Sequence, residues 1–321
     1  MANTPLNQIV NIINAAVLAG VPLLLGTTGE IITEKSGHLN LGVEGLMYIG
    51  AAFGFAAGYY TNSAAAALIC AFLGGVLGSA LYAFLTVTLR ANQNVTGLTL
   101  TVFGTGFANY IGDALINSTA SKAVSLSAEV KAAFNPASIP GLSALPIVGK
   151  LLFQYNMFVY LAVGIAILAG VYLTRTRTGL NLRAIGENAA AADAMGVRVT
   201  RYKYINIMFG GGICALGGAY IAIVTCGGTW IYNCVSGQGW IAVALVIFAG
   251  WSPYRALMGS LVFGGLSVIR FYLPGGHVPP AMLSMLPFVV TCVVLVVTSV
   301  RPARGGNQPA ACGVNYYREE R

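Results

Sequence analysis

The side chains with the clearest capacity for chemistry are a few polar groups that interrupt long apolar runs. Glu44 lies in LNLGVEGLMYIG at the start of one run, Asn40 precedes it, and Gln93 and Asn94 begin another. An ionisable residue at membrane depth is costly and therefore a functional candidate, and amides can both donate and accept hydrogen bonds to a polar solute. The alternative is structural. Glu44 would then satisfy the backbone of a broken helix, and the amides would cap helix ends.

A second broken segment, TWIYNCVSGQGWIAVAL, supplies Gln238 and Trp240 at the glycine-flanked start of an apolar run. An aromatic face suits stacking on a planar ligand, so both residues are candidates for lining a solute path. Trp230 and Tyr232 are better explained as anchors at a membrane interface. The segments LGVEGLMYIGAAFG and SGQGWIAVALVIFAG resemble each other weakly. Inverted pairs of interrupted helices point to a central site in transporters, so Glu44 and Gln238 would occupy comparable positions.

The elements that position these residues must be membrane helices. Hydrophobic residues make up 57% of the 321 residues, charged residues only 8%, and the mean hydropathy is +0.76. Crossing a bilayer takes about 20 apolar residues, and irregular backbone cannot face lipid. We therefore predict an all-α polytopic membrane protein with about eight to ten transmembrane helices, some interrupted, and leave open whether it contains an inverted repeat. The predicted spans are 8–28, 41–60, 64–89, 94–116, 154–173, 204–224, 237–250, 256–273 and 281–300.

The distribution of cations predicts the orientation. Residues 174–203 hold six cations and two acids. The positive-inside rule places this segment in the cytoplasm, together with the loop 29–40, Arg90, the turn 251–255 and the tail from residue 301. Thirteen of the seventeen Lys and Arg residues then lie on the cytoplasmic side. The net charge of +8 is thus explained by orientation, and no nucleic-acid partner is expected.

Within the basic segment, GENAAAADAMG over residues 186–196 predicts a short helix. Asn188 can cap the first turn, alanine is the strongest helix former, and Gly196 can end the helix in a left-handed conformation. A helix of about two turns is marginal alone in water. It therefore needs a surface to dock against, unless it is a plain connector.

These residues resemble a known family. TGLNLRAIGENAAAADAMGV is similar to the coupling-helix loop of ABC importer permeases in the branched-chain amino acid and monosaccharide superfamily. Further blocks, in the same order along nearly the whole chain, resemble nucleoside importer permeases. They are GEIITEKSGHLNLGVEGLM, RANQNVTGLTL, SGQGWIAVALVIFAGWSPYRALMGSLVFGG, MLPFVVTCVVLV and PAACGVNYYREER.

The resemblance implies a subunit that forms half of a transmembrane path, without an ATPase site or cofactor of its own. ATP and Mg²⁺ would be used by a cytoplasmic ABC ATPase, whose cleft would receive the short helix. Closure of the ATPases would alternate the accessibility of the path. A second homologous permease, identical or different, and an extracytoplasmic substrate-binding lipoprotein or periplasmic protein would complete the importer. The implied ATPase-coupling residues are Gly186, Glu187, Asn188, Ala191, Ala192, Asp193, Met195 and Gly196.

The implied organisation is a permease domain over residues 1–300 and a basic cytoplasmic tail over 301–321, in the cytoplasmic (inner) membrane. The domain would include the coupling loop 174–203 and an extracytoplasmic loop 117–150.

Other functions remain as alternatives. An ABC permease for a pentose or another monosaccharide would share all these features, whereas an ion-coupled secondary transporter has no need of the short helix. A membrane-embedded enzyme is disfavoured, because Glu44 and Asp113 are the only acids expected near the membrane interior and neither has an expected partner. His38 and His277 are expected as solvated loop residues. The six cysteines show no metal spacing, but pairing of the neighbouring Cys226 and Cys234 stays open.

Overall fold

The computed structural model describes residues 5–119, 123–136, 148–272, 282–283, 285–300 and 308–318. Over these residues the chain is almost entirely helical, and the one β-bridge joins Ser125 to Thr229. The helices are α1 (Pro5–Glu34), α2 (Val43–Thr61), α3 (Ala64–Ala83), α4 (Gln93–Asn117), α5 (Ala128–Ala133), α6 (Val148–Leu152), α7 (Met157–Arg175), α8 (Arg177–Glu187), α9 (Ala189–Ala194), α10 (Val199–Tyr220), α11 (Gln238–Phe248), α12 (Pro253–Val268) and α14 (Leu286–Val300). The π-helical turns η1 (Phe84–Thr88) and η2 (Ile221–Thr225) extend α3 and α10, and the 3-10 turn η3 (Ile269–Phe271) follows α12.

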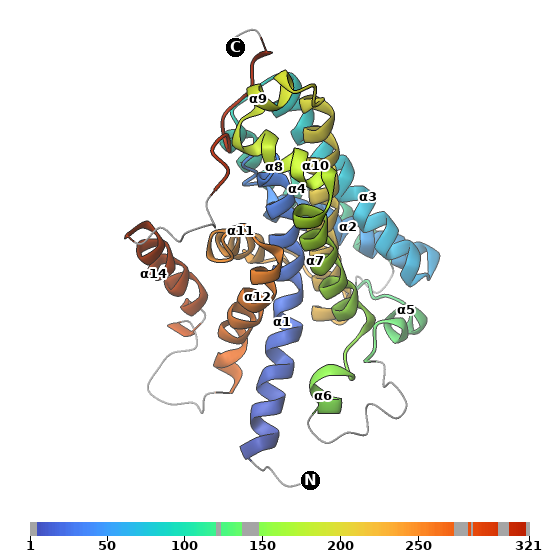
Figure 1. The fold of residues 1–321 in the computed structure, drawn as a ribbon. Coiled ribbons are helices and arrows are strands. Elements are labelled where there is room, and N and C mark those ends of the chain that lie inside the picture. Colours follow the sequence, from blue (N-terminus) through green and yellow to red (C-terminus); the bar gives the residue numbers. More distant parts are fainter. Residues whose placement is uncertain are drawn as a thin grey trace.

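Helices α1 and α10 form the centre of the fold. Helix α1 packs against α7, α10, α11 and α12, while α10 also packs against α2 and α3. Figure 1 shows α1 running through the middle of the molecule, with the N-terminus at one end and α9 and the C-terminus at the other. We call the latter the α9 end.

Small residues let these helices approach closely. A Cβ atom at Gly218 of α10 would lie 1.7 Å from the Met47 carbonyl oxygen of α2, and one at Gly50 would lie 2.1 Å from the Ala215 oxygen. Helices in lipid gain their association from such close packing, because lipid tails are as apolar as the side chains themselves.

All nine predicted spans contain a helix. Four helices are long and apolar enough to cross a bilayer by themselves, namely Gln8–Glu34, Ala64–Thr88, Met157–Arg175 and Val199–Thr225. The outward side of α3 exposes Leu73, Leu77 and Leu81, which suits contact with lipid. The chain is therefore a multi-pass membrane protein, as predicted.

Several boundaries differ from the prediction. Helix α1 continues to Glu34, so part of the predicted loop 29–40 is helical, and α8 forms in a segment where no helix was predicted. The long loop predicted over 117–150 contains the short helices α5 and α6, and its residues 120–122 and 137–147 lie outside the described residues.

Helices α2 and α11 both begin beside α1, before the end of that helix. A Cβ at Gly26, eight residues before the end of α1, would contact Val43 at the start of α2 and Ala242 in the second turn of α11. After Glu34 the chain must therefore turn back along α1 before α2 begins. Both glycine-rich segments therefore begin their helices beside α1 and not beyond its end, whereas their interruption and the inverted repeat stay predictions.

Candidate functional site

The predicted short helix exists as α9 and lies at one end of the molecule (Figure 1). The Asn188 side chain accepts a hydrogen bond from the Ala191 amide at 2.9 Å, and Gly196 has a φ of +83°. Both capping predictions are confirmed. Ala192 is buried against the body of the protein, whereas Ala191 is exposed and Met195 is 84% exposed. The helix therefore presents an exposed, partly apolar surface at this end.

Gly186 and Glu187 precede this helix, as expected for a helix capped by Asn188. They end α8, because the change of direction at Asn188 separates the two helices. The Gly186 carbonyl accepts a hydrogen bond from the Ala311 amide at 2.9 Å, and Glu187 accepts one from the Ala310 amide at 3.3 Å. Both residues therefore bind the chain's own C-terminal segment.

That segment, residues 308–318, runs across the α9 end, and we call it the C-terminal strap. Asp193 of α9 accepts a hydrogen bond from the Tyr316 hydroxyl at 2.7 Å and pairs with Arg318 at 3.1 Å. The Asn315 amide donates to the Arg90 carbonyl at 2.6 Å. The strap thus ties α9 to the loop that precedes α4. Sequence reasoning treated this segment only as a basic tail, because no local pattern reveals contacts between residues so far apart.

Gln93 and Asn94 lie at the same end. Gln93 is 3% exposed, accepts a hydrogen bond from the Leu39 amide at 2.9 Å and donates to Asn315 at 3.0 Å. Gln93 therefore has a structural role, because it joins the loop after α1 to the strap. Asn94 is exposed in the first turn of α4.

Asn40 is buried beside two acids that were not predicted there. Its backbone N–H donates to the Glu30 carboxylate at 3.0 Å, and its side-chain oxygen accepts from the Gly42 backbone N–H at 2.9 Å. Glu30 is fully buried and Glu34 is 2% exposed, with the Trp251 indole donating to Glu34. The expectation that Glu44 and Asp113 were the only interior acids is therefore wrong. Helix α1 carries two further carboxylates inward, because hydrogen-bond donors from distant segments meet them there.

The Glu44 carboxylate links the start of α2 to the start of α11. Its carboxylate is 5% exposed and accepts hydrogen bonds from the Gly237 amide at 2.8 Å and the Gly239 amide at 2.6 Å. These amides flank Gln238 at the start of α11, where a helix N-terminus favours negative charge. The two similar segments thus meet in space. The carboxylate makes the backbone contacts of the structural alternative, while Gln238 is half-buried and Trp240 is 37% exposed.

Trp230 and Tyr232, the two residues predicted as anchors at a membrane interface, differ in burial. Trp230 is 7% exposed and packs edge-on against Phe55 at a ring separation of 5.3 Å, so its assignment as an interface anchor is wrong. Tyr232 is 45% exposed and donates a hydrogen bond to Asp113 at 2.5 Å. Asp113 therefore has a partner that the sequence did not indicate.

The prediction for His38 is also corrected, and the open question about Cys226 and Cys234 is answered. His38 is 1% exposed, not solvated, because the strap and the start of α4 cover the loop that carries it. Burial and the positive charge of Lys203 hold the pKa of His38 well below its usual value. Cys226 and Cys234 are both free thiols. His277 lies outside the described residues.

Comparison with known proteins agrees with this architecture. The family model described as "Branched-chain amino acid transport system / permease component" matches residues 11–295. The guanosine ABC transporter permease protein NupQ of Bacillus subtilis is 32% identical over 98% of this chain and 99% of its own length. The nucleoside ABC transporter permease protein NupC of Lactococcus lactis is 31% identical over the same shares.

Two further similarities extend the comparison. A Haloferax volcanii permease whose name refers to glucose is 34% identical over 81% of this chain and 76% of its own length. A solved structure described as a metal-chelate type ABC transporter in an inward-facing conformation shares the fold, with a TM-score of 0.52 and 12% identity over 94% of this chain and 90% of that one. The chain belongs to the family of branched-chain amino acid transport system permease components, and it is an ABC transporter permease.

Proposed function

We propose that this permease imports nucleosides and is driven by a partner ATPase. The observation that carries the proposal is the similarity to NupQ and NupC, which extends over 98% of this chain and 99% of each relative. The similarity to the glucose permease covers 81% of this chain and favours a monosaccharide as the second candidate.

In this proposal α9 is the contact with the ATPase. Met195 and Ala191 are exposed there, while Asn188 caps the helix and the strap supports it from behind. A short supported helix can transmit a push, whereas one of this length alone would fray. ATP and Mg²⁺ belong to the ATPase. In this proposal the α9 end faces the cytoplasm, which the cations of residues 174–203 support, and a substrate-binding protein docks at the opposite end.

The proposed solute path passes the junction of α2 and α11. Trp240 is 37% exposed and Gln238 half-buried in a single chain, so a second, homologous permease facing them would enclose the path. Glu44 fixes the start of α11 and thereby positions both side chains. The accessibility of this junction would alternate as the two permeases are pushed together.

The test is uptake by proteoliposomes that contain this chain, its partner permease, the ATPase and the binding protein. Labelled guanosine, uridine, ribose and glucose are compared with ATP and with a non-hydrolysable analogue. We expect nucleoside uptake that requires hydrolysable ATP. Uptake of sugars alone would replace the nucleoside assignment, and uptake that is indifferent to ATP would refute the coupled mechanism.

A matched pair of variants tests the coupling role of α9. Ala191→Arg places a bulky charge on the exposed side of α9, and Ala184→Arg makes the same change on the exposed side of α8. We expect the first to abolish uptake while the chain still inserts, and the second to retain most uptake. Equal uptake by both variants would argue against α9 as the coupling contact. Asp193→Lys is less decisive, because it also breaks the strap contacts.

A further inference from the structure

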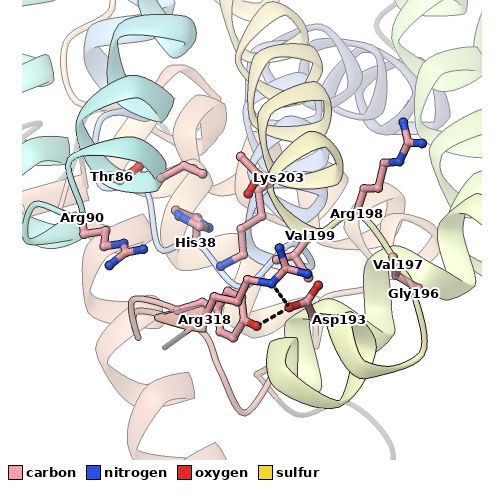
Figure 2. Close-up of a pocket in the computed structure, with 13 residues that line it drawn as sticks. His38, Thr86, Arg90, Asp193, Gly196, Val197, Arg198, Val199, Lys203 and Arg318 are labelled. Carbon is pink, nitrogen blue, oxygen red and sulfur yellow. Dashed lines mark hydrogen bonds and ion pairs between the residues drawn. The ribbon is translucent and has the colours of Figure 1, made fainter. Parts of the chain in front are cut away.

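A cavity of about 430 Å³ lies at the α9 end, separate from the junction of α2 and α11. It is enclosed by the loop after α1, the turn after α3, the segment between α9 and α10, and the strap. Figure 2 shows its interior. The residues that line it are His38, Thr86, Val87, Arg90, Asp193, Gly196, Val197, Arg198, Val199, Thr200, Lys203, Tyr316 and Arg318.

The lining is strongly cationic. Among the described residues that line it are Arg90, Arg198, Lys203 and Arg318 and one acid, Asp193. That acid already pairs with Arg318 and accepts the Tyr316 hydroxyl. In Figure 2 the side chains of Arg90 and Lys203 point toward the region beside His38, the Arg318 guanidinium lies against Asp193, and Arg198 points away. The cavity thus has an excess of positive charge.

Two of the lining side chains are buried and incompletely paired. Lys203 is 4% exposed, and among the described residues no carboxylate lies within ion-pair distance of its ammonium group. His38 is 1% exposed, and its Nδ1 has no hydrogen-bond partner in the described part of the chain. Buried polar groups are almost always hydrogen-bonded, and an unpaired buried charge costs several kcal/mol. An anion in the cavity would supply the counter-charge that the Lys203 ammonium lacks among the described residues.

The backbone at the start of α10 also favours an anion in the cavity. Helix α10 begins at Val199, and its N-cap residue Arg198 makes no capping hydrogen bond with its side chain. The first amides of a helix have no partner within it and carry a partial positive charge, which makes a helix N-terminus a common site for phosphate groups. Val199 and Thr200 both line the cavity.

We propose that this cavity binds a phosphate monoester, with Lys203, Arg90 and the start of α10 holding the phosphate. Its volume of about 430 Å³ exceeds what a bare phosphate ion needs and falls in the range of small-molecule sites. Room therefore remains for the group that the phosphate carries, beside the Tyr316 side chain. The same chemistry could be supplied by a free phosphate ester or by an anionic lipid headgroup.

The test measures binding by the full chain in nanodiscs of zwitterionic lipid, with labelled inorganic phosphate and guanosine monophosphate as probes and guanosine as the probe that lacks phosphate. We expect saturable binding of both phosphate probes at one site per chain and no displacement by guanosine. Lys203→Met should weaken binding at least tenfold. The matched control is Arg201→Met, which removes the same charge two residues away on α10 but outside the cavity lining, and it should change affinity less than twofold.

Absence of saturable phosphate binding by the unaltered chain would overturn the proposal. Equal weakening by Lys203→Met and Arg201→Met would also overturn it, because binding would then reflect diffuse surface charge. Should the lysine variant fail to fold, Arg90→Gln is expected to weaken binding at least fivefold, and full binding by that variant would count against the site. Nanodiscs with phosphatidic acid, whose headgroup is a phosphate monoester, identify the source. Loss of phosphate binding there supports a lipid headgroup as the occupant, and unchanged binding supports a free phosphate ester.

Discussion

Replacing Glu44 separates a structural role from direct contact with the solute. The carboxylate accepts two backbone hydrogen bonds, at 2.8 Å from Gly237 and 2.6 Å from Gly239, and is 5% exposed. Hydrogen bonds to charged groups contribute about 1.5–3 kcal/mol each. In Glu44→Gln the amide oxygen can keep one bond, but the amide NH₂ faces the other backbone donor. We expect a loss of about 2 kcal/mol in the free energy of unfolding.

Glu44→Ala should cost more, because both backbone donors then lose their acceptor in a buried site. We expect a loss of about 4 kcal/mol. A matched control is Thr101→Val, which removes one neutral hydrogen bond, from the Thr101 hydroxyl to the Leu41 carbonyl at 3.1 Å. Its expected cost is about 1 kcal/mol.

The assay is equilibrium unfolding in mixed micelles with an increasing fraction of denaturing detergent, followed by uptake measurements at a temperature where each variant stays folded. We expect the order of stability to be unaltered chain, Thr101→Val, Glu44→Gln and Glu44→Ala. We also expect the folded Glu44→Gln variant to retain its apparent affinity for the solute. A glutamine variant that is as stable as the unaltered chain but has lost uptake would refute the capping role and indicate contact with the solute.

Three further predictions follow from local geometry. Asn188→Ala should destabilise α9 by about 1 kcal/mol through loss of its cap, seen as faster amide hydrogen exchange in that helix alone; unchanged exchange would contradict the cap. Gly218→Ala should prevent correct packing of α10 against α2, since its Cβ would lie 1.7 Å from a backbone oxygen. The control Gly106→Ala, where no atom lies within 4 Å of the added Cβ, should leave the melting temperature in nanodiscs unchanged or slightly raised. Equal melting temperatures for the two variants would refute the packing. The lowered pKa of His38 means that the unfolded chain binds a proton at this histidine more readily than the folded chain, so the free energy of unfolding should fall as pH drops below about 6.5. In His38→Gln this loss of stability with falling pH should be smaller. Parallel pH profiles of stability for the variant and the unaltered chain would refute the role of His38.

Much of the fold was predictable because its signals are local. Long apolar runs located every span, and the alanine run with Asn188 and Gly196 located α9 together with both of its caps. The weak similarity between the segments around Glu44 and Gln238 singled out two segments that lie together at the starts of α2 and α11. Their meeting in space was not implied by the similarity, because it depends on how α2 and α11 pack against α1.

The remaining features depend on contacts between distant residues. Glu30 and Glu34 lie inside because Asn40 and Trp251 reach them, and neither partner is visible from the sequence around α1. The strap is a stronger example. Its Tyr316 meets Asp193, 123 residues earlier in the chain, so no periodicity or motif could have revealed the pairing.

The central claim is that α9 contacts the ATPase, and site-specific photo-cross-linking tests it most directly. A photoreactive amino acid is placed at Met195, which is 84% exposed, and at Tyr60, which is 69% exposed at the far end of α2. In membranes that contain the assembled transporter, the probe at position 195 should cross-link to the ATPase, and the probe at position 60 should not. Cross-linking at position 60 alone, or none at position 195 in a transporter that imports its solute, would contradict the account.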